Sequence, residues 1–282
     1  MNILFNIKDV VTSRTSVRNY GNAEITPEIQ QKIHDFIQTL TNPFDKQVSY
    51  HFLNDTDLQS KTNLGTYGVI KGAHKFIGTT ITNTEFALEA LGYELEVLML
   101  YLTSLGLGTC WLGGTFNREG FAEAMQIDEK SLFPIITPYG YPASSKHLKE
   151  KAMRRIVKAD QRKDWKEIFF LNNFDTPLKE IDAKELAFPL EMVRLAPSAS
   201  NKQPWRVVII DNACHFFEYK EPGYSNRFDY DIQRIDLGIA AAHFDLATKE
   251  ENIQGCFFTN KNPLISLPKH VEYVFSWITI NT

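Results

Sequence analysis

Two arginines and a hydroxyl side chain lie close together near the start of the sequence. Within residues 13–18, Arg14 and Arg18 are four residues apart, with Ser16 midway and Thr15 beside it. This spacing puts two guanidinium groups and a hydroxyl donor on one side of a short segment. A phosphate dianion is bound by several charge-assisted donors of this kind. The segment is therefore a candidate phosphate site, although a solvated basic turn before a helix has the same composition.

Two further segments have the residue types needed to hold a planar heterocycle. Residues 197–205 read P-S-A-S-N-K-Q-P-W, a stiff loop whose Asn201 and Gln203 amides can both donate and accept hydrogen bonds. Residues 106–114 read G-L-G-T-C-W-L-G-G, and paired glycines let a backbone lie close to a flat ligand. The spacing of residues 197–205 alone also fits an ordinary turn beside a buried tryptophan. The spacing of residues 106–114 alone also fits a helix C-cap followed by a buried turn.

Helical and extended patterns alternate around these segments. Thr26 followed by Pro27 and Glu28 predicts an N-cap with proline at the first helical position, opening a helix over 26–40. Long apolar runs predict two core helices over 84–105 and 235–251. Helices are also predicted over 183–195 and in the charged segment 146–166. Strands are predicted at 48–53, 76–81, 132–138, 206–210, 256–258 and 273–280.

The second half of the sequence repeats the order of the first. Residues 46–55 align without gaps with residues 202–211, and a helix and a proline-containing turn precede both segments. The predicted helix ending at Gly108 likewise matches the predicted helix ending at Gly255. These two echoes indicate an internal duplication. We therefore expect two units, residues 1–172 and 173–282.

Composition narrows the class of protein. The chain has 282 residues, a formal net charge of −4 and scattered basic residues, which argues against nucleic acid as a partner. Residues 97–117 carry no charge, but their glycine-rich end predicts a buried helix and turn rather than a membrane span. Three cysteines without a C-x-x-C pair predict neither a disulfide framework nor a zinc site. With no signal-peptide pattern, we expect a cytoplasmic protein.

Together these segments resemble the FMN-dependent nitroreductase family. Residues 14–18 are similar to its R-x-S-x-R motif, and residues 197–205 to its P-S-x-x-N-x-Q-P-W motif. Residues 106–114 resemble its glycine loop, 139–142 its G-Y-P string, and 162–167 the basic segment that follows. The resemblance implies an α+β, nitroreductase-like fold with two similar α/β halves, central antiparallel-type sheets and long core helices.

The order of the motifs departs from the family. The P-S-x-x-N segment ordinarily follows soon after R-x-S-x-R, but that early position holds Thr-Asn-Pro-Phe-Asp at 41–45. This order resembles the long, internally duplicated members, in which one chain imitates the usual homodimer. Since the second half has neither a phosphate clamp nor a Gly-Gly loop, at most one FMN per chain is expected. A monomer, as a pseudo-dimer, or a homodimer is compatible with this arrangement.

The resemblance also implies roles for individual residues. The phosphate would be held by Arg14, Ser16, Arg18 and Arg162. The flavin ring would contact the backbone of Leu112, Gly113 and Gly114. The other side of the ring would be covered by Pro197, Ser198, Ala199 and Asn201. Where the family often has Asn and Lys, this chain has G-T-Y-G at 65–68, so backbone groups or Tyr67 would substitute. The expected cofactor-binding set is Arg14, Thr15, Ser16, Arg18, Tyr67, Gly68, Trp111, Leu112, Gly113, Gly114, Arg162, Pro197, Ser198, Ala199 and Asn201, with no metal ligands.

The implied function is reduction of a small electron acceptor, such as a nitroaromatic compound or a quinone, by ping-pong hydride transfer. NADH or NADPH would be the electron donor, and the flavin would carry the chemistry. No histidine has the spacing of a catalytic acid or base, so no side chain is assigned that role. The alternatives are a non-catalytic or degenerate flavin-binding protein, and a flavin enzyme of another reaction such as dehalogenation or flavin breakdown.

Overall fold

Two β-sheets form the framework of the computed structural model, which describes residues 5–54, 64–144, 155, 158 and 160–280. The strands of the first sheet, in the order β1-β2-β4-β3, are β1 (Ser49–Leu53), β2 (Phe76–Ile81), β4 (Leu132–Gly140) and β3 (Gly108–Thr109). The strands of the second, in the order β5-β6-β7-β9-β8, are β5 (Phe169–Leu171), β6 (Trp205–Ile210), β7 (Ala213–Tyr219), β9 (Val271–Thr279) and β8 (Gly255–Phe258). All neighbours are antiparallel except β5 and β6, which are parallel.

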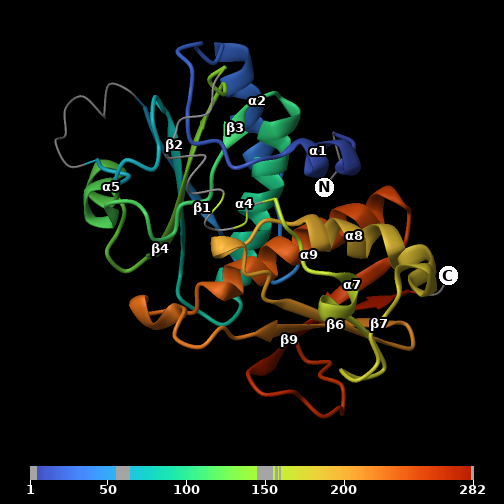
Figure 1. The fold of residues 1–282 in the computed structure, drawn as a ribbon. Coiled ribbons are helices and arrows are strands. Elements are labelled where there is room, and N and C mark those ends of the chain that lie inside the picture. Colours follow the sequence, from blue (N-terminus) through green and yellow to red (C-terminus); the bar gives the residue numbers. More distant parts are fainter. Residues whose placement is uncertain (1–4, 55–63, 145–154, 156–157, 159, 281–282) are drawn as a thin grey trace.

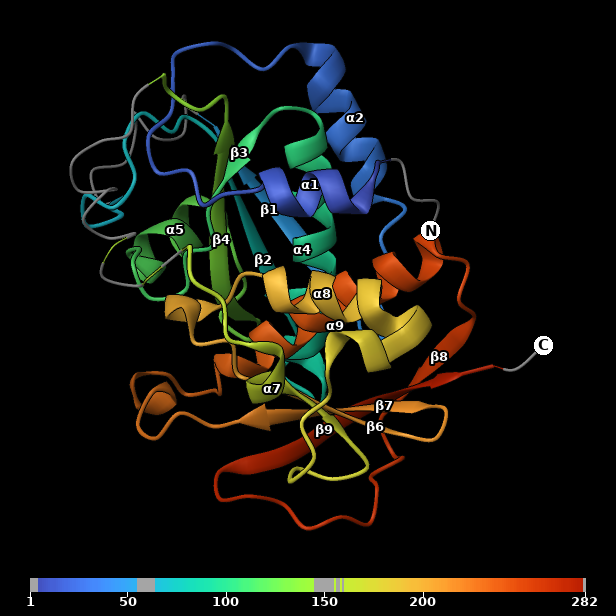
Figure 2. The same cartoon turned by 45° about the vertical axis from the view of Figure 1, so that its right-hand side comes forward.

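Helices pack against both sheets and against each other (Figures 1 and 2). The α-helices are α1 (Ile7–Ser13), α2 (Pro27–Ile37), α4 (Ala87–Ser104), α5 (Arg118–Ala124), α7 (Trp165–Ile168), α8 (Ala187–Leu195) and α9 (Gln233–Glu250), with short 3₁₀ helices at Glu180–Leu186, Ala199–Asn201 and Ser225–Arg227. The predicted cap of α2 is present, since the Thr26 hydroxyl accepts a hydrogen bond from the Ile29 N–H at 3.3 Å. The α+β class predicted from the sequence is confirmed.

The two halves share one topology. Strands β1-β2-β4-β3 and β6-β7-β9-β8 have the same order and the same antiparallel pairing. An 18-residue helix, α4 or α9, connects the second strand to the short edge strand in each. The gapless alignment of 46–55 with 202–211 places β1 opposite β6, and Gly108 and Gly255 begin β3 and β8. Strand β5 lies before the expected boundary at 172/173 but belongs to the second sheet, because it ends at Leu171 and pairs with β6.

The halves meet where α4 and α9 cross (Figures 1 and 2). Gly92 and Gly238 are each the sixth residue of their helix. A Cβ atom on Gly92 would lie 2.2 Å from the carbonyl oxygen of Ile235, and one on Gly238 would lie 2.0 Å from that of Glu89. The two backbones are therefore in direct contact at a reciprocal position, and only glycine fits there.

Some elements departed from the sequence-based expectation. Strand β7 was not predicted, because all but its last residue are buried and it lacks the alternating pattern of a half-exposed strand. The Asp211-Asn212 pair that joins Ile210 to Ala213 is a two-residue hairpin turn, a signal that favours a strand on both sides. The charged helix predicted over 146–166 falls largely outside the described residues; within its described part Arg155 and the start of α7 are helical, whereas residues 160–164 are not. Among the described helices, none is long and apolar enough to cross a membrane.

The helix crossing yields a first prediction. Gly238→Ala forces a methyl group against the backbone of α4, so we expect the free energy of unfolding to fall by about 1–3 kcal/mol or more. Gly21→Ala is the matched control, because its Cβ would meet no atom closer than 3.8 Å. Chemical denaturation of both variants measures the difference. Equal stabilities would contradict close backbone contact at the crossing.

Candidate functional site

A cavity of about 260 Å³ lies between the two halves. Twelve of the residues expected from the sequence line it: Arg14, Ser16, Arg18, Trp111, Leu112, Gly113, Gly114, Arg162, Pro197, Ser198, Ala199 and Asn201. They come from four segments that are up to about 190 residues apart in the chain. The structure thus brings together the arginine segment, the Gly-Gly loop and the 197–201 loop around one cavity.

The arginine segment is extended where it passes β3. Arg14 closes α1, its N–H donating to the Val10 carbonyl at 2.8 Å, and the Val17 N–H then donates to the Thr109 carbonyl at 2.8 Å. Side chains alternate along an extended segment. Arg14, Ser16 and Arg18 consequently line the cavity. Thr15 lies outside the cavity lining and is exposed for the same reason.

The two guanidinium groups have unused donors. Arg14 Nη1, Arg18 Nε and Arg18 Nη1 are buried and form no hydrogen bond with any described residue. Buried polar atoms are ordinarily hydrogen-bonded, and a cationic donor is especially costly to leave unpaired. Three such donors on cavity-lining side chains make this end of the cavity suitable for an anion with several oxygens.

The Gly-Gly loop presents backbone rather than side chains. The Leu112 N–H donates to the Ile136 carbonyl at 3.1 Å, so this N–H is not available to a ligand. No described residue accepts a hydrogen bond from the N–H of Gly113 or Gly114. A Cβ on Gly113 would approach the Ile232 side chain to 2.8 Å, so the loop fits closely against α9.

The 197–201 loop is held from several sides. The Ala199 N–H donates to Asp236 Oδ1 at 2.9 Å, and the Ser198 hydroxyl accepts from the Gln203 N–H at 2.8 Å. Ser200 and Asn201 both have positive φ, 49° and 55°, an uncommon conformation for residues other than glycine. Arg162 is part of this support, since Nε and Nη2 donate to the Leu195 carbonyl at 3.2 and 3.1 Å.

Tyr67 and Gly68 lie outside the cavity lining. Tyr67 is 71% exposed, and both residues have positive φ, 49° and 72°, in a turn that faces solvent. The next residue, Val69, lines the cavity instead. Trp111 does line the cavity, and its indole N–H donates to Glu96 at 2.8 Å. Glu96 also contacts the Nε2 atom of His243 at 2.9 Å, and both side chains are fully buried.

Part of the lining was missing from the sequence-based set. It comprises Val69, Thr115, Ile135, Ser200, Tyr224, Arg227, Phe228, Ile232, Ile235, Asp236 and Ile239. Four of these residues, Ile232, Ile235, Asp236 and Ile239, lie at the start of α9 and follow the i, i+3, i+4, i+7 spacing of one helix face. That spacing was visible in the sequence, but an apolar helix face is typical of a protein core and does not by itself indicate a ligand.

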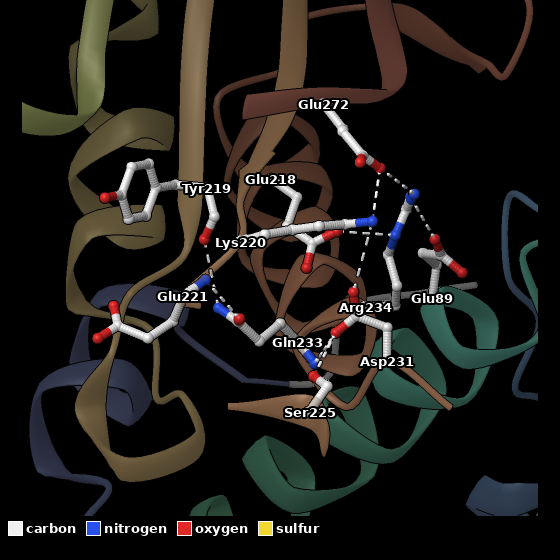
Figure 3. A network of polar contacts seen from close by, with 10 residues as sticks. All are labelled: Glu89, Glu218, Tyr219, Lys220, Glu221, Ser225, Asp231, Gln233, Arg234 and Glu272. Carbon is white, nitrogen blue, oxygen red and sulfur yellow. Dashed lines mark hydrogen bonds and ion pairs between the residues drawn. The ribbon is translucent and has the colours of Figure 1, made fainter. Parts of the chain in front are cut away.

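The connection from β7 to α9, which carries Tyr224, Arg227 and Phe228, is fixed by a charged network (Figure 3). Arg234 contacts Glu218 at 2.9 Å and Glu89 at 3.1 Å, which joins α9 to β7 and to α4. Lys220 contacts Glu272 of β9 at 2.6 Å. Further hydrogen bonds within the connection are Ser225 to Asp231, Gln233 to Asp231 and Glu221 to Gln233. This wall of the cavity is therefore tied to both halves.

Glu218 is the most buried carboxyl group of that network. Its side chain is fully buried, and burial, together with the negative charge of Asp231, raises the pKa of Glu218 from about 4.5 to about 8. The attraction of Arg234 acts in the opposite direction but does not outweigh burial.

Comparison with known proteins gives one family and several solved structures. The family model described as "Putative TM nitroreductase" matches residues 6–248. A crystal structure described as a putative nitroreductase from Thermotoga maritima is 19% identical, with a TM-score of 0.62, and the match covers 99% of this chain and 95% of that one. At this identity the likeness shows the fold.

Other solved structures match about half of this chain. A putative NADH dehydrogenase/NAD(P)H nitroreductase from Bacteroides thetaiotaomicron is 19% identical, with a TM-score of 0.45, over 57% of this chain and 95% of that one. An FMN-dependent nitroreductase from Clostridium difficile is 20% identical, with a TM-score of 0.41, over 49% and 88%. A search of curated protein sequences found no match.

The raised pKa of Glu218 predicts a pH-dependent stability. A carboxyl group whose pKa is higher in the folded than in the unfolded state stabilises the fold at low pH, and this contribution is lost as the pH rises from about 4.5 to about 8. Glu218→Gln removes the titration, so its free energy of unfolding should fall less than that of the wild type over this range. Denaturation at several pH values measures both profiles, and parallel profiles would contradict the assignment.

Proposed function

Because this chain belongs to the family described as "Putative TM nitroreductase", we propose that it is an FMN-dependent NAD(P)H oxidoreductase of small electron-poor acceptors. The observation that carries the proposal is the set of unpaired guanidinium donors in the cavity between the halves. Nitroaromatic compounds and quinones are the proposed acceptors, with NADH or NADPH as donor. One chain supplies every segment of the cavity, so a monomer is sufficient.

The arginine end of the cavity suits the phosphate of FMN. Arg14 and Arg18 offer buried, unpaired N–H donors, and Ser16 adds a hydroxyl between them. Charge-assisted hydrogen bonds of this type are the strong ones in proteins. Arg162 also lines the cavity and adds positive charge, while two of its nitrogens hold the 197–201 loop through Leu195.

The middle of the cavity suits a flat ring. The first half of the chain offers the N–H groups of Gly113 and Gly114 to a ligand. The second half contributes the 197–201 loop to the same cavity. Bound FMN would supply two-electron hydride-transfer chemistry between NADH or NADPH and the acceptor. The N–H groups of the loop would stabilise negative charge on the ring edge that they face. The apolar side chains of Ile135, Ile232 and Ile235 would exclude water from the ring.

The pseudo-symmetric position supports one flavin per chain. When the alignment of 46–55 with 202–211 is extended by two residues, Phe44 corresponds to Ser200. Phe86 corresponds to Ile232, because each is the residue before the first residue of its long helix, α4 or α9. Phe44 is buried and packs against Phe86 and Phe275, with ring centroids 5.9 and 5.4 Å apart. Aromatic side chains therefore fill the place that a second ring would need.

The visible absorption spectrum of the purified protein tests the proposal. We expect a flavin band after addition of FMN, bleaching of that band by NADH or NADPH, and its return when a nitroaromatic compound or a quinone is added. Bleaching without return would support a flavin enzyme of another reaction. Bound flavin that no nicotinamide reduces would support a non-catalytic flavin-binding protein. A protein that binds no FMN would overturn the proposal.

Loss of one guanidinium should weaken cofactor binding. We expect Arg14→Ala to reduce FMN affinity by about 1.5–3 kcal/mol, the range for a hydrogen bond to a charged group, or about 10- to 150-fold in Kd. Lys32→Ala, which removes an equal charge from the exposed face of α2, should leave the Kd unchanged. Fluorescence titration of FMN measures both. Equal affinities for Arg14→Ala and wild type would remove Arg14 from the phosphate site.

A further inference from the structure

Asp236 is an acidic side chain in the wall of a cavity whose other charged lining residues are arginines. It lies in the first turn of α9, on the same helix face as Ile232, Ile235 and Ile239. Only 2% of the residue is exposed. A helix fixes the position of its side chains better than a loop does, so this carboxyl group has a defined place in the cavity.

The two oxygens of Asp236 have different surroundings. Oδ1 accepts a hydrogen bond from the Ala199 N–H at 2.9 Å and so helps to hold the 197–201 loop. Oδ2 is buried and has no hydrogen-bond partner among the described residues. Oδ1 is therefore used by the protein, whereas Oδ2 is a polar atom without a partner on a residue that lines the cavity.

Two acidic groups act on Asp236. Glu218 of β7 and Asp231, just before α9, both raise its pKa. The guanidinium group of Arg234 is engaged by Glu89 and Glu218 instead. No described lysine or arginine forms an ion pair with Asp236.

Other titratable and charged groups share the cavity lining with Asp236: Arg14, Arg18, Arg162, Tyr224 and Arg227. Even so, burial is the largest effect and raises the pKa of Asp236 well above its ordinary value. A buried carboxyl group without a cationic partner is more stable in its neutral form.

We propose that Asp236 holds a proton at Oδ2 and donates it, as a hydrogen bond, to a carbonyl oxygen or an unprotonated nitrogen of the bound flavin ring. This inference rests on the proposed function. A neutral carboxyl group is both acceptor and donor, so Asp236 can hold Ala199 through Oδ1 and the ring through Oδ2 at the same time. FMN binding is then linked to protonation, since ionised Asp236 has no hydrogen to donate.

The test is the Kd of FMN between about pH 5 and about pH 9.5 for the wild type and for Asp236→Asn. Asparagine keeps the acceptor for Ala199 and has a permanent N–H donor in place of the titrating O–H. We expect the wild-type affinity to fall by up to about tenfold per pH unit above the pKa of the free protein. Asp236→Asn should lose this decline. The phosphate of FMN titrates equally in both measurements and cancels in their ratio.

Glu218→Gln is the matched control, because Glu218 is a neighbouring buried carboxyl group that does not line the cavity. It should retain a decline with pH, which begins at a lower pH because Glu218 is one of the groups that raise the pKa of Asp236. The infrared difference spectrum on adding FMN to the wild type is a second readout, and the carbonyl band of a protonated carboxyl group should shift. This second readout needs no variant, so it applies even if Asp236→Asn fails to fold.

Superimposable pH profiles of wild type and Asp236→Asn would overturn the inference, as would an infrared spectrum without a shifted carboxyl band. Weaker binding by Asp236→Asn at every pH would also overturn it, because an ionised carboxylate would then be the binding form. In each of these outcomes FMN still binds, so the proposed function is unaffected. Failure of the wild type to bind FMN at any pH would instead overturn the proposed function.

Discussion

The contact between the backbones of α4 and α9 is the constraint on which the rest of the molecule depends. Gly92 faces the Ile235 carbonyl and Gly238 faces the Glu89 carbonyl, so each helix contributes the glycine that lets the other approach. Contacts of this kind are reciprocal wherever two similar units meet across a two-fold axis. The cavity is formed beside this crossing, with the first turn of α9 as one of its walls. Its shape therefore depends on how closely the two helices pack.

The two halves share a topology but differ in chemistry. One side of the pseudo-symmetric pair has a cavity with unpaired guanidinium donors and free glycine N–H groups. On the other side, the ring of Phe44 is packed among aromatic side chains. Burying an aromatic ring stabilises the fold through the hydrophobic effect, whereas a polar cavity leaves donors unsatisfied until a ligand arrives. The chain thus combines one site suited to a ligand with one position that contributes to the core.

Buried carboxyl groups near the start of α9 connect stability to the site. Arg234 contacts Glu89 and Glu218 and so joins α9 to α4 and β7 (Figure 3). No described lysine or arginine forms an ion pair with Asp236. Burial of several acidic groups costs free energy when they ionise, and the folded state then retains protons that the unfolded state would release. The same helix turn that completes the cavity wall is therefore sensitive to pH.

The sequence by itself predicted most of the long elements and about half of the cavity lining. The cap at Thr26 predicted α2, and long apolar runs predicted α4 and α9. The spacing of Arg14, Ser16 and Arg18 predicted three donors on one side of a segment. Only the tertiary structure decided that Asp236 faces this cavity, that Tyr67 faces solvent, and that the Leu112 N–H is taken by Ile136. The reason is physical: local periodicity is set by the geometry of helix and strand. The neighbours of a given atom, in contrast, depend on how segments far apart in the chain pack together.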